Sequence, residues 1–67
     1  MVWESYVGKK VFIEDNNNRT YGGVVEEIVD IGDGILFLSF TYIDKFGNKR
    51  WVTLRVSEII KIKEDVK

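Results

Sequence analysis

The sequence of 67 residues contains no cysteine, no histidine and no proline. Without cysteine the chain has no disulfide and no thiolate metal site, and the additional lack of histidine argues against zinc. Histidine is also the usual base that activates a serine nucleophile, so the serines lack that partner. No glycine-rich phosphate loop with its lysine occurs either. We therefore expect a protein that is not an enzyme and that uses no metal or cofactor.

Long apolar runs and an excess of positive charge are lacking too. No segment approaches the about 20 apolar residues of a membrane span, and the start of the chain lacks the pattern of a signal peptide. We therefore expect a cytoplasmic protein without membrane contact. Ten lysines and arginines against 11 aspartates and glutamates give a net charge of -1. This balance argues against duplex DNA as a partner, because duplex binders present a basic face.

The short length limits how much surface the protein can bury. One domain, 1–67, is expected, and a domain of this size buries roughly 60% of the surface that its unfolded chain exposes. Apolar residues make up 45% of the chain and aromatic residues 13%, which suits a compact β core. A core this small predicts that copies of the chain associate with one another.

Five segments rich in β-branched and aromatic residues are expected to be strands, and glycines and asparagines lie between them. Before them, residues 2–8 predict a short helix that ends at Gly8. After them, Glu64–Lys67 is expected to be a loose tail. In chain order the five expected strands run from Lys9 to Asp15, Thr20 to Asp30, Ile35 to Asp44, Arg50 to Val56 and Ile59 to Lys63.

Two adjacent glycines, Gly22 and Gly23, lie inside the second expected strand. Glycines there predict a sharp bend or bulge, which lets one strand serve both sides of a small structure. The third expected strand has one wholly apolar face and one half-apolar face, which is typical of a central strand. The predicted fold is therefore all-β: a small, strongly bent, five-stranded antiparallel barrel with a short N-terminal helix.

Two motifs in this layout resemble the Sm-like family. The stretch GKKVFIEDNNNRTYGGVV (Gly8–Val25) is similar to the family's first motif, in which Gly-Lys precedes strand one and a polar turn leads to a glycine in strand two. The stretch VTLRVSEIIKI (Val52–Ile62) is similar to the second motif, and Arg55 falls where the family has its arginine. The resemblance covers about residues 2–63 and implies the same bent five-stranded barrel, in the variant often described as SH3-like.

The resemblance also implies single-stranded, often uridine-rich RNA as a partner. Family members contact RNA around a central pore, and their arginine lies at a pore-facing turn, which assigns an RNA contact to Arg55. If Asp30 is the family's aspartate, the base-stacking position falls on Gly32 and the base-reading asparagine on Gly34. In the other register these positions are Ile31 and Asp33. The family's Arg-Gly pair is also replaced, because valine follows the arginine.

The third implication concerns assembly. Sm-like proteins form rings of six or seven subunits, in which the fourth strand of one subunit pairs with the fifth strand of the next. The resemblance thus implies a homo-oligomeric ring. Its interface is expected to include Trp51 and Thr53 on the fourth strand and Ile60 and Ile62 on the fifth strand.

Other interpretations of the same residues stay open. Arg55 fits equally an ordinary solvent-facing residue on a half-buried strand. Trp51 and Phe46 fit the contact surface of an SH3-like barrel that binds other proteins and no RNA. The acidic segment Glu26–Asp33 is expected to be a solvated edge that repels phosphate, with a site for a hard cation as the alternative.

Overall fold

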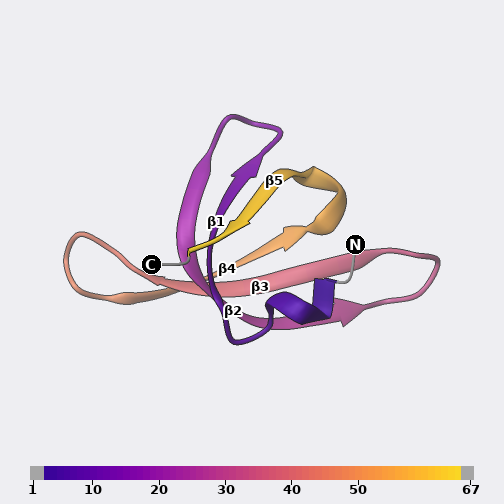
Figure 1. Cartoon of the computed structure of the whole chain (residues 1–67), viewed down its shortest axis with the longest axis horizontal. Helices are drawn as coiled ribbons and strands as arrows, with labels where there is room; N and C mark the ends of the chain where they lie inside the picture. The colour runs from indigo at the N-terminus through magenta and orange to yellow at the C-terminus, as the bar shows by residue number, and fades with distance from the viewer. Residues whose placement is uncertain (1–2, 66–67) are drawn as a thin grey trace.

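Five antiparallel strands form one sheet in the computed structural model, which describes residues 3–65 (Figure 1). The order across the sheet is β4-β3-β2-β1-β5, and two single turns of 3-10 helix accompany it. The all-β class and the five antiparallel strands are confirmed. The elements are η1 (Trp3–Tyr6), β1 (Lys10–Asp15), β2 (Thr20–Asp30), β3 (Leu36–Ile43), β4 (Lys49–Arg55), η2 (Val56–Glu58) and β5 (Ile59–Glu64).

Strand β2 is bent, as the paired glycines predicted, and it divides its length between two neighbours. Residues Thr20–Val24 pair with β1, and Val24–Asp30 pair with β3 (Figure 1). A side chain at Gly23 would collide with the carbonyl oxygen of Thr41, so only glycine allows the two strands to approach this closely. The pairing with β3 also shifts register between Val25 and Glu27. A bulge therefore follows the glycines rather than including them.

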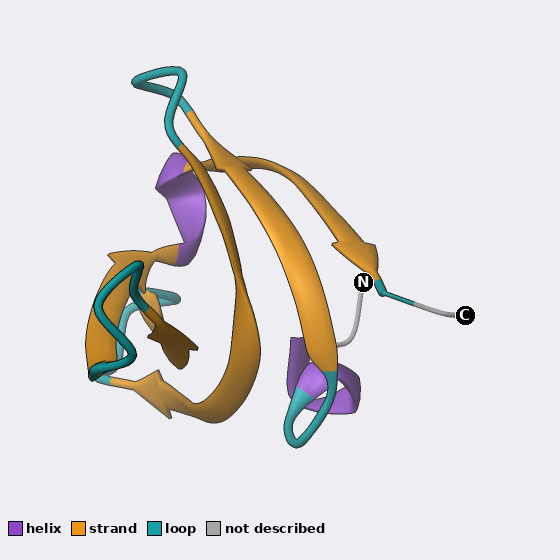
Figure 2. Cartoon of the chain, turned by 90° about the vertical axis from the view of Figure 1, so that its left-hand side faces the viewer, coloured by secondary structure: helices purple, strands orange, loops and turns teal. Residues whose placement is uncertain are grey.

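The sheet curls without closing on itself. Strands β4 and β5 form its two edges, and within residues 3–65 they make no ladder with each other. The η2 turn connects them, and Figure 2 shows the sheet curving from one edge to the other. The result is a strongly curved open sheet.

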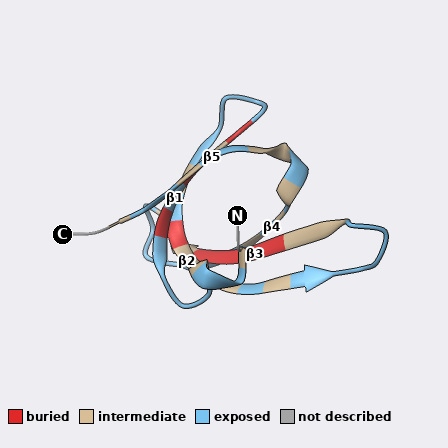
Figure 3. Ribbon diagram, turned by 45° about the vertical axis from the view of Figure 1, so that its right-hand side comes forward, coloured by how far each residue is buried: buried red, intermediate tan, exposed pale blue. Residues whose placement is uncertain are grey.

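The buried core is formed by the middle strands of the sheet, β1, β2 and β3 (Figure 3). Alternation along each strand turns every second side chain inward, which is why β1 buries Val11 and Ile13 but exposes Phe12. The other face of β3 is also covered: Ser39 Oγ lies 3.0 Å from Thr53 Oγ1, and Thr41 Oγ1 donates to Glu26 Oε1 at 3.1 Å. The fully buried apolar side chains are Val11, Ile13, Val25, Leu38 and Phe40.

The two ends of the chain differ from the sequence predictions. The predicted two-turn helix is one turn of 3-10 helix, and the amide of Gly8 donates to Val25 O at 2.8 Å, which directs the chain into β1. Strand β5 includes Glu64, and the amide of Asp65 donates to Lys10 O at 2.8 Å. The predicted loose tail therefore does not begin at Glu64. Its last two positions, and Val2 of the predicted helix, lie outside the described residues.

Candidate nucleic-acid interface and sheet edges

Two connections meet at one end of the sheet: the loop 31–35 between β2 and β3, and η2 between β4 and β5 (right-hand side of Figure 1). A hollow of about 360 Å³ lies between them. Gly34 and Arg55, two residues expected to contact RNA, both contribute to its wall. The full lining is Trp3, Gly34, Ile35, Leu36, Arg55, Val56 and Ser57.

Strand alternation and one aromatic ring position Arg55. It is the last residue of β4, on the face opposite Val52 and Leu54, which pack against the core. In the ladder it lies opposite Phe37, and its guanidinium carbon is 5.7 Å from the centre of that ring. The ring attracts the cation and limits its orientations. Arg55 is exposed and forms no ion pair within residues 3–65, so its planar donors are open to a ligand.

The other predicted RNA-contacting residues shape the loop rather than extend side chains from it. Asp30 Oδ1 accepts a hydrogen bond of 2.8 Å from the amide of Gly32. Gly32, Asp33 and Gly34 all have positive φ, at 97°, 56° and 74°, a conformation that glycine adopts without strain. The tight loop therefore explains the glycines at these positions. They provide neither an aromatic side chain to stack on a base nor a side-chain amide to read one.

Carboxylates dominate the charge at this end. Asp30 at the end of β2 and Asp33 in the loop are exposed, and Glu58 in η2 is half-buried. Arg55 is the basic residue in these two connections and their flanking positions. Within residues 3–65, no three carboxylates gather closely enough to hold a metal ion. The structure thus favours the solvated acidic edge over the cation site.

The two edge strands expose apolar side chains next to their outer backbones. Trp51 on β4 is 62% exposed, and Ile60 on β5 is 60% exposed. Ile62, however, packs against the core. The register explains this separation: Asp15 pairs with Ile59 and Glu14 pairs with Lys61, so Ile60 is an extra residue that breaks the alternation. Of the two β5 residues assigned to the interface, only Ile60 presents most of its side chain to solvent.

Thr53, the fourth predicted interface residue, is exposed but already has a partner within the chain. Its hydroxyl lies 3.0 Å from Ser39 Oγ across the β3–β4 ladder. Thr53 is therefore a poorer anchor for the proposed neighbouring subunit than Trp51, whose ring is 62% exposed and has Lys49 Nζ 5.7 Å from its centre.

The hairpin between β3 and β4, at the opposite end of the sheet, is organised by one carboxylate. Asp44 Oδ1 accepts the amides of Phe46 and Asn48, each at 2.9 Å, and Oδ2 accepts Arg50 Nε at 2.8 Å. The hydrogen bond from the Asn48 amide, followed by that from Arg50, holds the pKa of Asp44 below its usual value. The same carboxylate raises the pKa of Arg50.

Comparison with known proteins finds no family model, no curated protein and no solved structure that matches this chain. The resemblance to the Sm-like family therefore depends on the two motifs. No helix within residues 3–65 is long and apolar enough to cross a membrane.

One exposed aromatic residue received no role from the sequence. Phe12 lies in the middle of β1, and its ring is 52% exposed. The alternation of Phe12 with Val11 and Ile13 is the signal in the sequence that places its ring outside.

Proposed function

We propose that this chain is a non-catalytic Sm-like protein that assembles with copies of itself into a ring. The observation that carries the proposal is the strand order, in which β4 and β5 are the two edges of the sheet. Each edge presents a row of backbone N–H and C=O groups that can pair with another strand. Pairing β4 of one copy with β5 of the next continues the antiparallel sheet, and a head-to-tail contact of this kind closes into a ring when the rotation between successive copies completes a circle.

The small core supports assembly on energetic grounds. Among residues 3–65, five apolar side chains are fully buried, while Trp51 and Ile60 remain largely exposed on the edges that would pair. Burying such side chains against a neighbour contributes roughly 25 cal/mol for each Å² of apolar surface. Trp51 is the type of large aromatic side chain that anchors interfaces. In the assembled ring, the curved sheet of each subunit forms the small bent barrel that the family resemblance implies.

The proposed ligand of the ring is single-stranded RNA, contacted by Arg55. The guanidinium is exposed, oriented by Phe37 and placed beside the loop that contains Gly34. Such a group can stack on a base and donate to phosphate. Asp30, Gly32 and Gly34 then contribute the shape of the loop and its open space, since a side chain added at either glycine would meet nothing within 4 Å.

Light scattering after size-exclusion chromatography tests the assembly. We expect a mass that is a multiple of the 7.8 kDa subunit, because the edge strands pair between copies. Ile60→Lys should reduce this mass by placing a charge at the paired edge. Ile43→Lys is the matched control, since Ile43 is 64% exposed but lies on β3, which is not an edge strand. A wild-type mass near that of one subunit at micromolar concentration would contradict the ring.

A protein-interaction module without RNA binding is the second candidate, and one observation favours it. The β3–β4 hairpin projects from the sheet (Figure 1) and displays Phe46, 75% exposed, and Trp51. A monomeric mass together with no binding to oligouridine at low salt would select this function over the ring.

A further inference from the structure

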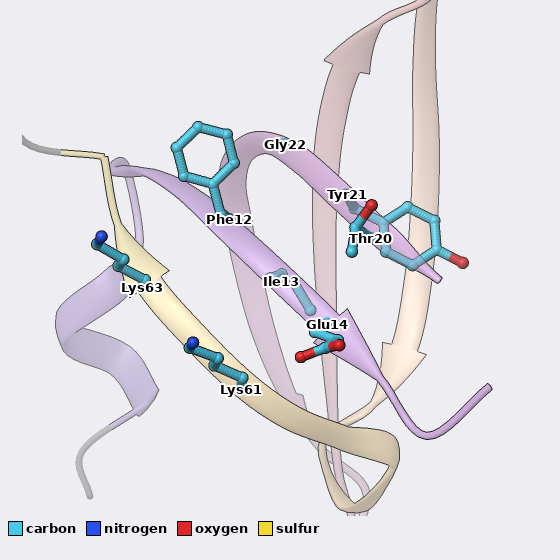
Figure 4. Close-up of a pocket in the computed structure, with 8 residues that line it drawn as sticks. All are labelled: Phe12, Ile13, Glu14, Thr20, Tyr21, Gly22, Lys61 and Lys63. Atoms are coloured by element: carbon cyan, nitrogen blue, oxygen red, sulfur yellow. The ribbon is translucent and has the colours of Figure 1, made fainter. Parts of the chain in front are cut away.

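A second hollow, of about 530 Å³, lies on the outer face of the sheet where β2, β1 and β5 run side by side (Figure 4). It lies away from the loop 31–35 and from η2, and none of its residues lines the hollow beside Arg55. Its lining consists of Phe12, Ile13, Glu14, Thr20, Tyr21, Gly22, Lys61 and Lys63.

The ring of Phe12 stands on this face as an open platform. In the register of the sheet, Phe12 lies between Gly22 on β2 and Lys63 on β5. A Cβ atom at position 22 would come within 3.3 Å of Phe12 Cε1. The edge of the ring therefore lies over the glycine, whose missing side chain makes room for it, while half of the Phe12 side chain stays exposed. Figure 4 shows the ring projecting from β1 with no labelled side chain covering it.

Two lysines on the neighbouring strand supply positive charge beside the platform. Lys61 and Lys63 alternate with the inward-facing Ile62, so both ammonium groups lie on the outer face (Figure 4). Their backbone positions are about 6.6 Å apart, which is twice the rise of a strand. This spacing is close to that between successive phosphates of an extended single strand.

Within the described residues these two lysines differ from the other lysines near the same strands, although Glu14 lies opposite Lys61 in the ladder. Lys9 pairs with Glu64 at 3.6 Å, and Lys10 pairs with Asp65 at 3.5 Å. Neither Lys61 nor Lys63 forms an ion pair within residues 3–65. Glu14 is the one carboxylate among the residues that line the hollow, so the lining has a surplus of one positive charge.

We propose that this face binds single-stranded nucleic acid, with a base stacked on Phe12 and consecutive phosphates on Lys61 and Lys63. A flat ring favours a base over an acidic peptide, because each base has a π-face that stacks on an aromatic side chain. A single strand is favoured over a duplex, since the bases of a duplex are already stacked on one another. The site shares its ligand class with the proposed function but uses different residues, and it is complete on one chain.

Titration of a fluorescently labelled oligouridine with the full chain tests the platform. Phe12→Ala should weaken binding by roughly tenfold, the loss expected for one base that no longer stacks on an aromatic ring. Phe46→Ala is the matched control, because Phe46 is also an exposed phenylalanine but lies on the hairpin. It should leave the affinity unchanged. Phe12→Leu keeps apolar bulk without the flat ring and should bind as weakly as Phe12→Ala, and Phe12→Tyr should restore binding.

The salt dependence of the same titration tests the lysines. Each phosphate contact on a single strand contributes about 0.7 to the slope of log K against log salt. The double variant Lys61→Gln/Lys63→Gln should therefore lower the slope by about 1.4. The control Lys45→Gln/Lys49→Gln removes two lysines that lie over the rings of Phe46 and Trp51, at 5.3 and 5.7 Å, and should not change the slope.

The outcomes separate this site from the proposed function. Unchanged oligouridine affinity in both Phe12→Ala and Phe12→Leu overturns the site, and a loss confined to Arg55→Ala would then leave only the Arg55 contact. Loss in the Phe12 variants with none in Arg55→Ala supports this site and removes Arg55 from RNA binding. Equal affinity of the wild type for a polyglutamate peptide and for oligouridine would overturn the stacking platform. So would the absence of any oligouridine binding at low salt.

Discussion

The two ends of the sheet are built alike and charged oppositely. At one end Asp30 holds the loop 31–35, and at the other Asp44 holds the β3–β4 hairpin, each by accepting backbone amides. The hairpin end has three basic residues against one carboxylate, whereas the Arg55 end has one basic residue against three carboxylates. The hairpin residues are Lys45, Lys49, Arg50 and Asp44, and those of the other end are Arg55, Asp30, Asp33 and Glu58.

This contrast shows that the charge of a region does not by itself locate a binding site. Arg50 of the hairpin bonds Asp44, whereas Lys45 and Lys49 lie over aromatic rings, as Arg55 lies over Phe37 at the other end. Arg55, at the end with three carboxylates, forms an ion pair with none of them within residues 3–65. The difference between the two ends is therefore that Arg50 has a carboxylate within bonding distance and Arg55 does not.

The bend that positions the two ends should be the most sensitive feature. Gly23→Ala places a methyl group against the Thr41 carbonyl and the Phe40 ring, and we expect it to lower the free energy of unfolding by about 1–3 kcal/mol. Gly22→Ala is the matched control, because its methyl group meets only the Phe12 side chain, which can move. Urea denaturation of both variants measures the difference, and equal destabilisation would contradict a bend that depends on Gly23.

Loss of Arg55 should weaken RNA binding, whereas loss of a cation at the hairpin end should not. Arg55→Ala should weaken oligouridine binding roughly tenfold, because one stacking cation is lost. Lys49→Ala is the matched control at the other end, since Lys49 also lies over an aromatic ring. Fluorescence anisotropy measures both. The same affinity in Arg55→Ala and wild type would mean that the acidic end does not contact RNA.

The two aspartate-anchored turns should differ in stability. Asp44 accepts two amides and a guanidinium, whereas Asp30 accepts one amide. Asp44→Ala should therefore lower the Tm by a few degrees, and Asp30→Ala should lower it by less. Differential scanning fluorimetry compares the two variants, and a larger loss in Asp30→Ala would reverse the expected order.

The smallest effect should be the pH dependence of the hairpin. The hydrogen bonds from Asn48 and Arg50 lower the folded-state pKa of Asp44, so the carboxylate stabilises the fold at pH values above its unfolded pKa of about 3.9. This contribution is lost as the pH falls through the lower folded pKa. The Tm difference between wild type and Asp44→Ala should be constant near neutral pH and should shrink below about pH 4. A difference that grows on acidification would have the wrong sign.

Local patterns predicted the elements of this fold well. The strand Thr20–Asp30 has the bounds that the sequence indicated, because asparagines precede it and a glycine loop follows it. Asn18 has the positive φ, 61°, that its turn suggested. Features that depend on pairing were not predictable in this way. Ile60 and Ile62 separate because of a bulge that exists only when β5 lies against β1.

The candidate sites likewise combine features that the local sequence predicts with features that depend on strand pairing. Arg55 was found from a motif and from alternation, both of which are local. The proximity of Arg55 to Gly34 depends on the curl of the whole sheet. The two residues are 21 positions apart in the chain and line one hollow. Phe12 was overlooked because an apolar residue in an apolar strand suggests core. Only the pairing of Phe12 with Gly22 and Lys63 shows an exposed platform.

Amide hydrogen exchange of the edge strands tests the proposed self-assembly most directly. If β4 and β5 pair between copies, the outward-facing amides within Lys49–Arg55 and Ile59–Glu64 should exchange slowly at high protein concentration. They should exchange faster on dilution, while the amides of Val11 and Ile13 in the core stay protected. Outward-facing edge amides that exchange rapidly at every concentration would contradict the account.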